Sequence, residues 1–545
     1  MLDFSADSRR PALQRMAEQE FDVLVVGGGI TGCGVALDAA FRGLSVALVD
    51  RTDFAAGTSG RSSRMVHGGV RYLEQRAFGL VHESLTERRI LLRLAPHLVR
   101  PVPMYALGPL GKAGLQWRLG LTLYDLLAVG RNIRRHHWQG EDEVRRAVPG
   151  LGRPASALVY YECATDDARL TLEVARAARA AGALVANHAE VLALLGAGRV
   201  RGTAVVDRLT GERLEIRARA TVNATGVWAE QVHGLATDSP FRLSPSKGVH
   251  LVLRPGAVDT RVGLVLPSAA GDGRYVFVLP WADRTFVGTT DTRYDGDLAD
   301  PPVTVDDRAY LLAAVRQAFP SVVDSDVLAS WAGLRPLCDT GDGATADLSR
   351  RHVLDQTVPG LFTIAGGKLT TYRAMAEQLV DRLCASLGGR GPRGAGRRCR
   401  TRQIPLGLTG GLAATVERAV AAGARAGLPP GAGRRLVLRY GDDWTEALRL
   451  IRADPALAEP VAAGAPVLRV ELVLARTREM ALTDEDVLVR RTRLATLLGE
   501  QGVTTLAAGR PAAGRPAAGA PAAGAPAAEG PGLPGSGSTG DPRPP

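Results

Sequence analysis

Cysteine is scarce in this 545-residue chain, and its placement excludes two kinds of stabilised site. The five cysteines are Cys33, Cys163, Cys338, Cys384 and Cys399. Their number is odd, their spacings are wide, and no two of them form a Cys-x-x-Cys pair. The sequence therefore indicates neither a metal site nor a disulfide framework, and it fits a reducing cytoplasm.

A secretory leader and long apolar runs are also missing. The first residues, MLDFSADSRR, lack the charged-then-apolar pattern of a signal peptide. No apolar stretch is long enough to cross a bilayer, so we expect any membrane contact to be peripheral. The net charge of +11 is dispersed rather than clustered with aromatic residues, which argues against a nucleic-acid partner. A basic surface suits an anionic substrate or an anionic membrane equally well.

An apolar strand, a glycine-rich turn and a helix open the folded region. The strand FDVLVV precedes GGGITG, in which Gly27, Gly29 and Gly32 form a GxGxxG motif, and the next strand ends at Asp50. This context predicts a βαβ unit that binds a dinucleotide. We expect the pyrophosphate near Ile30, where the helix begins, and the ribose hydroxyls at Asp50.

Two later glycine turns favour FAD over NAD as the dinucleotide. TVNATG ends at Gly226, and IAGGKLTTYR places Gly366 and Gly367 between a strand and a helix. A second helix N-terminus can stabilise negative charge on a reduced flavin. Because FAD is long, it needs contacts from several distant segments, so the sequence predicts bound FAD.

The motifs as a set resemble the FAD-dependent glycerol-3-phosphate dehydrogenases. Residues 58–74, TSGRSSRMVHGGVRYLE, are similar to that family's signature. Further similar segments follow in the family's order: DDARL (166–170), VNATG (222–226), KGVH (247–250), VGTTD (287–291), GLRPLCD (333–339), GGKLTTYR (366–373) and EMALTDEDVLVRRTR (479–493). The resemblance covers about residues 20–500. The sequence departs from the family pattern at Asp50, where Glu is usual, and over residues 340–349.

This resemblance implies an α/β fold with a Rossmann-like FAD-binding domain, an antiparallel-sheet substrate domain like that of D-amino-acid oxidase, and a C-terminal helical domain. It implies oxidation of sn-glycerol 3-phosphate to dihydroxyacetone phosphate in glycerol catabolism, by hydride transfer from C2 to flavin N5. A membrane quinone is the implied acceptor, which would place the enzyme on the inner face of the cell membrane. Three alternatives stay open: an oxidase that uses oxygen, an amine or amino-acid oxidase, and a protein whose FAD only organises a binding surface. A homodimer is a further hypothesis.

We divide the chain on this basis. Residues 1–20 form an N-terminal arm, 21–385 the oxidoreductase region, 386–400 a linker, 401–505 the helical domain, and 506–545 a disordered Ala/Gly/Pro tail. Within the oxidoreductase region, the FAD-binding parts are about 21–80, 151–236 and 330–385, and the substrate-cap parts are about 81–150 and 237–329.

Further FAD-binding residues follow from the resemblance. They are Thr58, Ser59, Ser62, Ser63, His67, Gly68, Gly226, Gly366, Gly367, Lys368, Leu369 and Thr370.

The substrate-binding residues implied are Arg71, Tyr72, Arg335 and Arg350. A guanidinium group binds phosphate through paired N–H donors, which fits a phosphate ester. Arg351 is an alternative to its neighbour Arg350.

The catalytic residues implied are His250, Arg335 and Lys368. His250 could accept the substrate hydroxyl proton or could be a core histidine. Lys368 could contact the substrate or stabilise the reduced flavin.

Overall fold

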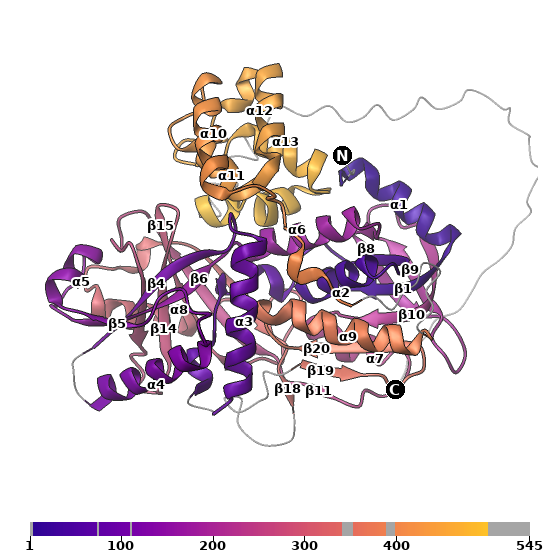
Figure 1. Cartoon of the computed structure of the whole chain (residues 1–545), viewed down its shortest axis with the longest axis horizontal. Helices are drawn as coiled ribbons and strands as arrows, with labels where there is room; N and C mark the ends of the chain where they lie inside the picture. Colours follow the sequence, from indigo (N-terminus) through magenta and orange to yellow (C-terminus); the bar gives the residue numbers. More distant parts are fainter. Residues whose placement is uncertain (1–3, 74–75, 109–111, 340–351, 389–397, 500–545) are drawn as a thin grey trace, which may run out of the picture.

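Two large sheets lie next to each other, and a group of C-terminal helices packs against the first of them (Figure 1). The computed structural model describes residues 4–73, 76–108, 112–339, 352–388 and 398–499. The α/β class, the antiparallel second sheet and the helical C-terminal domain are those predicted from the sequence.

The first sheet contains the βαβ unit. Its strands in spatial order are β19 (His352–Asp355), β20 (Leu361–Gly366), β10 (Arg213–Asn223), β1 (Glu20–Val26), β2 (Val46–Val49) and β7 (Leu184–Ala186), with β8 (Ala189–Leu194) and β9 (Gly202–Asp207) continuing from β10. The strands from β20 to β7 pair in parallel. A parallel strand covered on both faces needs apolar side chains throughout, and β1 is accordingly buried from Phe21 to Val26.

Helices cover both faces of this sheet. The helices α2 (Ile30–Phe41), α6 (Asp167–Ala180) and α9 (Tyr372–Ser386) share one apolar core with it, whereas α1 (Ala6–Glu18) packs on the other face. The short α7 (Ala229–His233) follows β10. Cys33, Cys163 and Cys338 are buried free thiols in this structure.

The second sheet is mostly antiparallel. Its strands in order are β16 (Thr292–Arg293), β12 (Ser246–Leu253), β15 (Arg284–Gly288), β14 (Tyr275–Trp281), β13 (Gly263–Pro267), β4 (Arg100–Leu107), β6 (Ala157–Ala164) and β3 (Met65–Val66); β17 (Val327–Arg335) pairs with β12, and β5 (His137–Gln139) pairs with β6. A separate two-stranded sheet joins β11 (Arg242–Leu243) to β18 (Cys338–Asp339).

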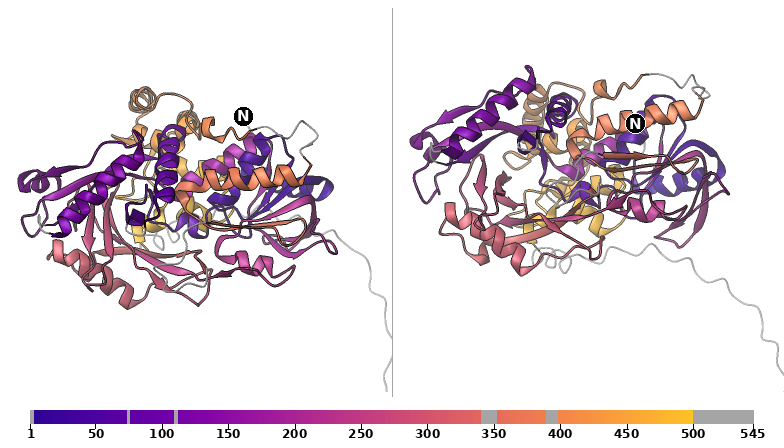
Figure 2. Two further views of the ribbon diagram at one scale, coloured as in Figure 1. Left: turned by 60° about the horizontal axis from the view of Figure 1, so that its bottom comes forward. Right: turned by 90° about the horizontal axis from the view of Figure 1, so that it is seen from below.

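Two pairs of helices enclose the second sheet (Figure 2). One face packs against α5 (Glu141–Ala147) and α8 (Val305–Ala318), and the other against α3 (Phe78–Leu94) and α4 (Lys112–Ala128). Successive side chains of a strand point to opposite faces. Val249 and Leu251 of β12 therefore join the core under α8, while Val252 joins the core under α3 and α4. His250 has the same parity as Val252, which turns its ring towards the interior of the molecule between the two sheets.

The C-terminal helices form their own core. They are α10 (Leu412–Arg425), α11 (Ala432–Tyr440), α12 (Trp444–Ala453) and α13 (Arg469–Arg478), followed by a π-helical turn at Asp486–Arg491. Leu436, Val437, Leu448 and Leu474 are buried among them.

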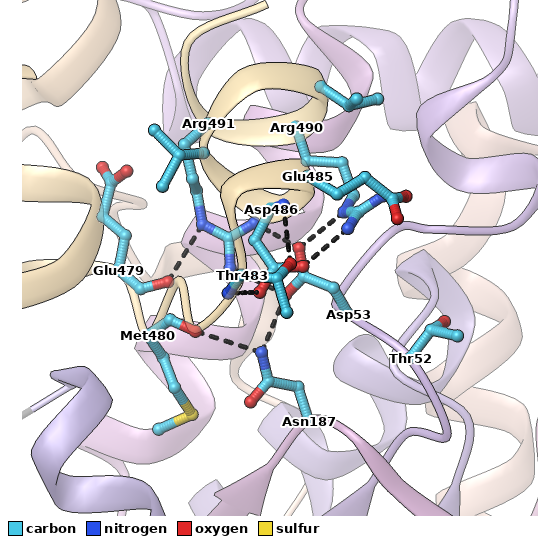
Figure 3. A network of polar contacts seen from close by, with 12 residues as sticks. Thr52, Asp53, Asn187, Glu479, Met480, Thr483, Glu485, Asp486, Arg490 and Arg491 are labelled. Atoms are coloured by element: carbon cyan, nitrogen blue, oxygen red, sulfur yellow. Dashed lines mark hydrogen bonds and ion pairs between the residues drawn. The ribbon is translucent and has the colours of Figure 1, made fainter. Parts of the chain in front are cut away.

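A buried carboxylate ties this domain to the first sheet (Figure 3). Asp53 is fully buried and accepts hydrogen bonds from Arg491 Nη1 at 2.6 Å, Arg491 Nη2 at 2.8 Å, Arg490 Nε at 2.6 Å and Asn187 Nδ2 at 2.9 Å. Burial alone would raise the pKa of Asp53, but Arg491 holds this pKa below its usual range. Asn187 Nδ2 also donates to Met480 O at 3.0 Å. A buried charge is stable only when it is paired, so the arginines of the C-terminal segment stabilise the Asp53 carboxylate in the loop after β2.

Candidate active site

A cavity of about 1220 Å³ lies between the two sheets. It exceeds the usual size of a site for one small molecule, which suits a dinucleotide together with a small substrate. The residues predicted for the site that line it are Gly27, Gly29, Ile30, Asp50, Thr58, Ser59, Ser62, Ser63, His67, Tyr72, Gly226, His250, Arg335, Gly366, Gly367, Lys368, Leu369 and Thr370.

The turn after β1 forms one end of the cavity. Gly27 has a φ of +109°, and a Cβ on it would lie 2.6 Å from Ala224 O, so a side chain cannot be accommodated there. A Cβ on Gly32 would lie 1.9 Å from Gly27 O, which gives Gly32 a packing role in the first turn of α2. The backbone N–H of Ile30 points to Ser59 Oγ at 2.9 Å, at the positive end of α2. This glycine cradle and helix N-terminus fit a pyrophosphate.

Asp50 stands beside that turn, at the end of β2. Its Oδ2 accepts the backbone N–H of Gly28 at 2.6 Å, and its Oδ1 accepts that of Thr52 at 2.8 Å. Burial raises the pKa of this carboxyl group, and the two backbone hydrogen bonds oppose the rise. Its place on the cavity wall fits an acceptor for ribose hydroxyls.

His250 lies at the other end of the cavity, on β12. Its imidazole stacks on Trp331 with ring centroids 4.9 Å apart, and its Nε2 lies 2.9 Å from Ser63 Oγ. Burial lowers the pKa of His250 well below its ordinary value, and the positive charges of Arg335 and Arg64 lower it further. The imidazole is therefore neutral at neutral pH and can accept a proton.

Arg335 ends β17 next to His250. Its Nη1 lies 3.2 Å from Asp291 Oδ1 and 3.4 Å from Ser246 Oγ, and its Nη2 lies 3.2 Å from Thr289 Oγ1. A Cβ on Gly248, across the strand pair, would lie 2.6 Å from Arg335 Nη2, so this glycine makes room for the guanidinium. The side chain is 26% exposed, which leaves its charge accessible from the cavity.

Lys368 and Tyr72 meet on the α3 side of the cavity. The Lys368 Nζ lies 3.5 Å from the centroid of the Tyr72 ring and donates to Ser84 Oγ at 3.4 Å. The tyrosine is buried. This cation–π contact fixes the ammonium group at the start of the last helix of the oxidoreductase region.

Four predicted residues are not among the described residues that line the cavity, and Gly32, with the packing role given above, is one of them. Gly68 donates its backbone N–H to Glu162 Oε2 at 2.9 Å, so it fixes the loop to a side chain that lines the cavity. Arg71 belongs to the short helical turn Val70–Leu73, but its side chain lies outside the described part of the structure. Arg350 and Arg351 lie outside the described residues altogether.

Arg274 was not among the residues predicted from the sequence. Its side chain lines the cavity, and its Nη1 donates to Asp291 O at 2.7 Å, next to the carboxylate that holds Arg335. It follows the turn of the β13–β14 hairpin, and no motif in the sequence distinguishes it from other surface arginines. Within the described residues, no group of His, Cys, Asp and Glu side chains is arranged to bind a metal ion.

Comparisons with known proteins agree with this geometry. A family model described as FAD dependent oxidoreductase matches residues 22–382, and one described as C-terminal domain of alpha-glycerophosphate oxidase matches residues 399–508. Glycerol-3-phosphate dehydrogenase 2 of Mycobacterium tuberculosis (strain ATCC 25618 / H37Rv) is 39% identical over 507 residues, which are 91% of this chain and 84% of the relative. The aerobic glycerol-3-phosphate dehydrogenase of Staphylococcus haemolyticus is 37% identical, covering 89% and 88% of the two chains.

Solved structures show the same relationship. The glycerol-3-phosphate dehydrogenase from Bacillus halodurans, complexed with FAD, matches with a TM-score of 0.75 and 32% identity over 93% of this chain and 92% of that one. Glycine oxidase from Bacillus cereus, at 17% identity and a TM-score of 0.52, shares only the fold, over 67% of this chain. With a matching family model over most of its length and relatives above 30% identity along it, this chain belongs to the FAD-dependent glycerol-3-phosphate dehydrogenase family.

Proposed function

We propose that this protein oxidises sn-glycerol 3-phosphate to dihydroxyacetone phosphate and passes the two electrons to a membrane quinone. The observation that carries the reaction is a neutral, buried imidazole beside a fixed guanidinium on the wall of a dinucleotide-sized cavity. A phosphate ester with a neighbouring secondary alcohol matches this pair of groups.

Arginines anchor the substrate phosphate in this proposal. Arg335 is held by Asp291, Ser246 and Thr289, so little side-chain entropy is lost when it binds an anion. Arg274, fixed through Asp291 O, adds a second positive charge to the same wall. Arg71 and Arg350 stay candidates for the same task.

His250 is the proton acceptor in this proposal. Oxidation of the alcohol removes a hydride from C2 and a proton from the hydroxyl group, and His250 Nε2, next to Ser63 Oγ, accepts that proton. FAD, when bound, supplies the acceptor for the hydride. Gly27, Ile30 and Asp50 would hold the nucleotide part of FAD, and the 366–370 turn with Lys368 would hold the part near the substrate.

An exposed apolar face next to the cavity supports the membrane part of the proposal. Leu119, Leu123 and Leu126 of α4, with Val129 just after it, are between 37% and 69% exposed. The spacing of the three leucines puts them on one side of the helix. Trp117 and Gly120 of the same helix line the cavity.

The surroundings of this face suit an anionic bilayer. Arg118, Arg134 and Arg135 are exposed on and after α4, and such side chains favour an anionic surface. None of the helices in the described ranges is long and apolar enough to cross a membrane. A quinone in the bilayer would then lie close to the substrate cavity.

One anaerobic experiment tests the reaction. Glycerol 3-phosphate added to the purified yellow protein should bleach the visible absorbance of the flavin, and a quinone analogue should restore it. Glycine and other amines should leave the spectrum unchanged. A spectrum that no polyol phosphate alters would remove the proposal, and restoration by oxygen with release of peroxide, but not by quinone, would favour the oxidase.

A variant pair tests the membrane surface. Replacing Leu119 and Leu126 by Ser should reduce binding to anionic vesicles and quinone reduction, while turnover with a water-soluble dye stays unchanged. Leu209→Ser, at a side chain that is 45% exposed on the distant β9–β10 hairpin, is the matched control. Equal vesicle binding by both proteins would show that this face of α4 is not the membrane-binding surface.

A further inference from the structure

The segment that carries Ser62 and Ser63 is held by Asp167, at the start of α6. Ser62 donates its backbone N–H to Asp167 Oδ2 at 2.9 Å and its hydroxyl to the same oxygen at 2.7 Å. Ser63 follows directly and contacts His250 Nε2. The position of Asp167 therefore decides where this cavity wall, and the hydroxyl that orients His250, are placed.

Asp167 in turn forms an ion pair with an arginine of the C-terminal domain. Arg493 Nη2 contacts Asp167 Oδ1 and lies 2.8 Å from Asp166 Oδ1, and Arg493 Nη1 donates to Gly60 O at 3.1 Å. The Arg493 side chain is 3% exposed and that of Asp167 is fully buried. One guanidinium thus binds the segment directly, at Gly60, and through the carboxylate that holds Ser62.

The conformation of Arg493 is itself unusual. Its φ is +60°, in the left-handed region that residues other than glycine rarely adopt. Such a conformation persists only where surrounding contacts determine it, and it is concentrated at functional sites. Burial would raise the pKa of Asp166, but Arg493, Arg439 and Arg64 hold it below its usual range, so the Asp166–Arg493 contact stays ionic.

The far end of the segment is also fixed. Thr58 donates its hydroxyl to Leu334 O at 2.7 Å, beside Arg335. Residues 58–63 are therefore held at one end by the strand that ends in Arg335 and at the other by Arg493 of the C-terminal domain. Arg491, two residues before Arg493, anchors the same C-terminal stretch to Asp53 (Figure 3).

We propose that Arg493 is a positioning residue of the active site, through which the C-terminal domain sets the Ser62–Ser63 wall and hence the alignment of His250 with the substrate. The described residues of the C-terminal domain do not line the cavity, so this contribution to turnover is indirect. This inference rests on the proposed function, because His250 acts there as the proton acceptor.

The test compares Arg493→Lys with Arg435→Lys. Lys keeps the positive charge but loses the fork that reaches Asp167, Asp166 and Gly60 together. Arg435 also pairs with a fully buried carboxylate, that of Glu471, but inside the C-terminal domain. Arg435→Lys therefore controls for a loss of stability of that domain.

With FAD saturating, we expect kcat of Arg493→Lys to fall roughly 10- to 100-fold, since a displacement of about 1 Å in an active site has an effect of this size. KM should change less than about threefold, because the phosphate contacts are untouched. Hydrogen exchange of residues 58–66, measured on FAD-bound, substrate-free protein, should speed up. Arg435→Lys should match the wild type in all three measurements.

Asp166→Asn gives a second measure if Arg493→Lys fails to fold. It weakens the grip on Arg493 at a carboxylate that is 17% exposed and leaves the Asp167–Ser62 bonds in place. We expect a smaller loss of kcat, about threefold to tenfold, and faster exchange at 58–66.

Wild-type kcat and exchange in either folded variant would overturn the inference. Equal losses in Arg493→Lys and Arg435→Lys would do the same. A wild-type protein that does not oxidise glycerol 3-phosphate would defeat the proposed function instead, and the exchange measurement would still decide whether Arg493 positions the segment.

Discussion

Arg335→Lys should be a severe change although it keeps the charge. The guanidinium spans Asp291, Ser246 and Thr289 with two of its nitrogens, at distances of 3.2 to 3.4 Å. A lysine ammonium is a single point charge and cannot hold these partners and a phosphate in one plane. The variant should therefore lose both the preorganisation of the site and one charge-assisted hydrogen bond to the substrate.

The magnitude follows from that lost bond. A hydrogen bond to a charged group contributes about 1.5–3 kcal/mol, which corresponds to roughly a tenfold to hundredfold fall in kcat/KM. If the contact is equally strong throughout the reaction, the loss appears in KM. If Arg335 also aligns C2 of the substrate, kcat falls as well.

The assay is steady-state kinetics with flavin occupancy measured in the same sample. Arg254→Lys is a matched control. Arg335 pairs with the first residue of β12, whereas Arg254 follows the last; Arg254 pairs with Asp326 at 2.7 Å and does not line the cavity. We expect that control to keep its kcat/KM. Unchanged kcat/KM in fully flavinated Arg335→Lys would refute the assignment and leave Arg274 and Arg71 as the phosphate anchors.

Four further predictions follow. Because burial, Arg335 and Arg64 lower the pKa of His250, kcat/KM should stay flat as the pH falls through 6.5. Arg64→Met removes one cation and should move the acidic limb of the pH profile to higher pH. An acidic limb that does not move would show that it does not report the titration of His250. Burial, with Arg169 second, lowers the pKa of His97 from 6.5 to about 4, so the folded state stays neutral where the unfolded state takes up a proton. The free energy of unfolding should therefore fall by about 2 kcal/mol between pH 7 and pH 5 from this residue, and denaturant titrations of His97→Gln should show a correspondingly weaker pH dependence. Acid precipitation should release FAD into the supernatant, and a yellow pellet would contradict non-covalent binding. Deleting 506–545, an Ala/Gly/Pro repeat, should leave kcat unchanged, and a large loss at normal flavin content would show that the tail takes part.

Local sequence predicted the first strand and turn closely. FDVLVV followed by a glycine-rich turn leaves few options other than a buried parallel strand entering a helix, and β1 and α2 occupy those residues. Boundaries that depend on packing were less accurate. The start of α3 at Phe78, for example, carries no side-chain cap that would mark it in the sequence.

The environment of His250 was not predictable in the same way. Its motif indicated a role but left a proton acceptor and a core histidine as alternatives. The structure shows that it is buried and stacked on Trp331, and that it also lies on the cavity wall, where its Nε2 meets Ser63 Oγ. Trp331 and Ser63 are far from His250 in the chain. The pairing of β12 with β17 places Trp331 beside His250, and tertiary packing of the loop before β3 brings Ser63 to it.

By itself, the sequence determined the cofactor class, the family and the glycine turns that line part of the cavity, because glycine turns and strand-ending motifs act through local backbone geometry. Tertiary structure alone decided what depends on distant charges. It placed Arg274 on the cavity wall, lowered the pKa of His250 through burial and the charges of Arg335 and Arg64, and brought Arg493 of the C-terminal domain onto Asp167. Electrostatic and hydrogen-bond partners are chosen by distance in space, and separations of more than three hundred residues, as between Asp167 and Arg493, leave no periodic signal along the chain.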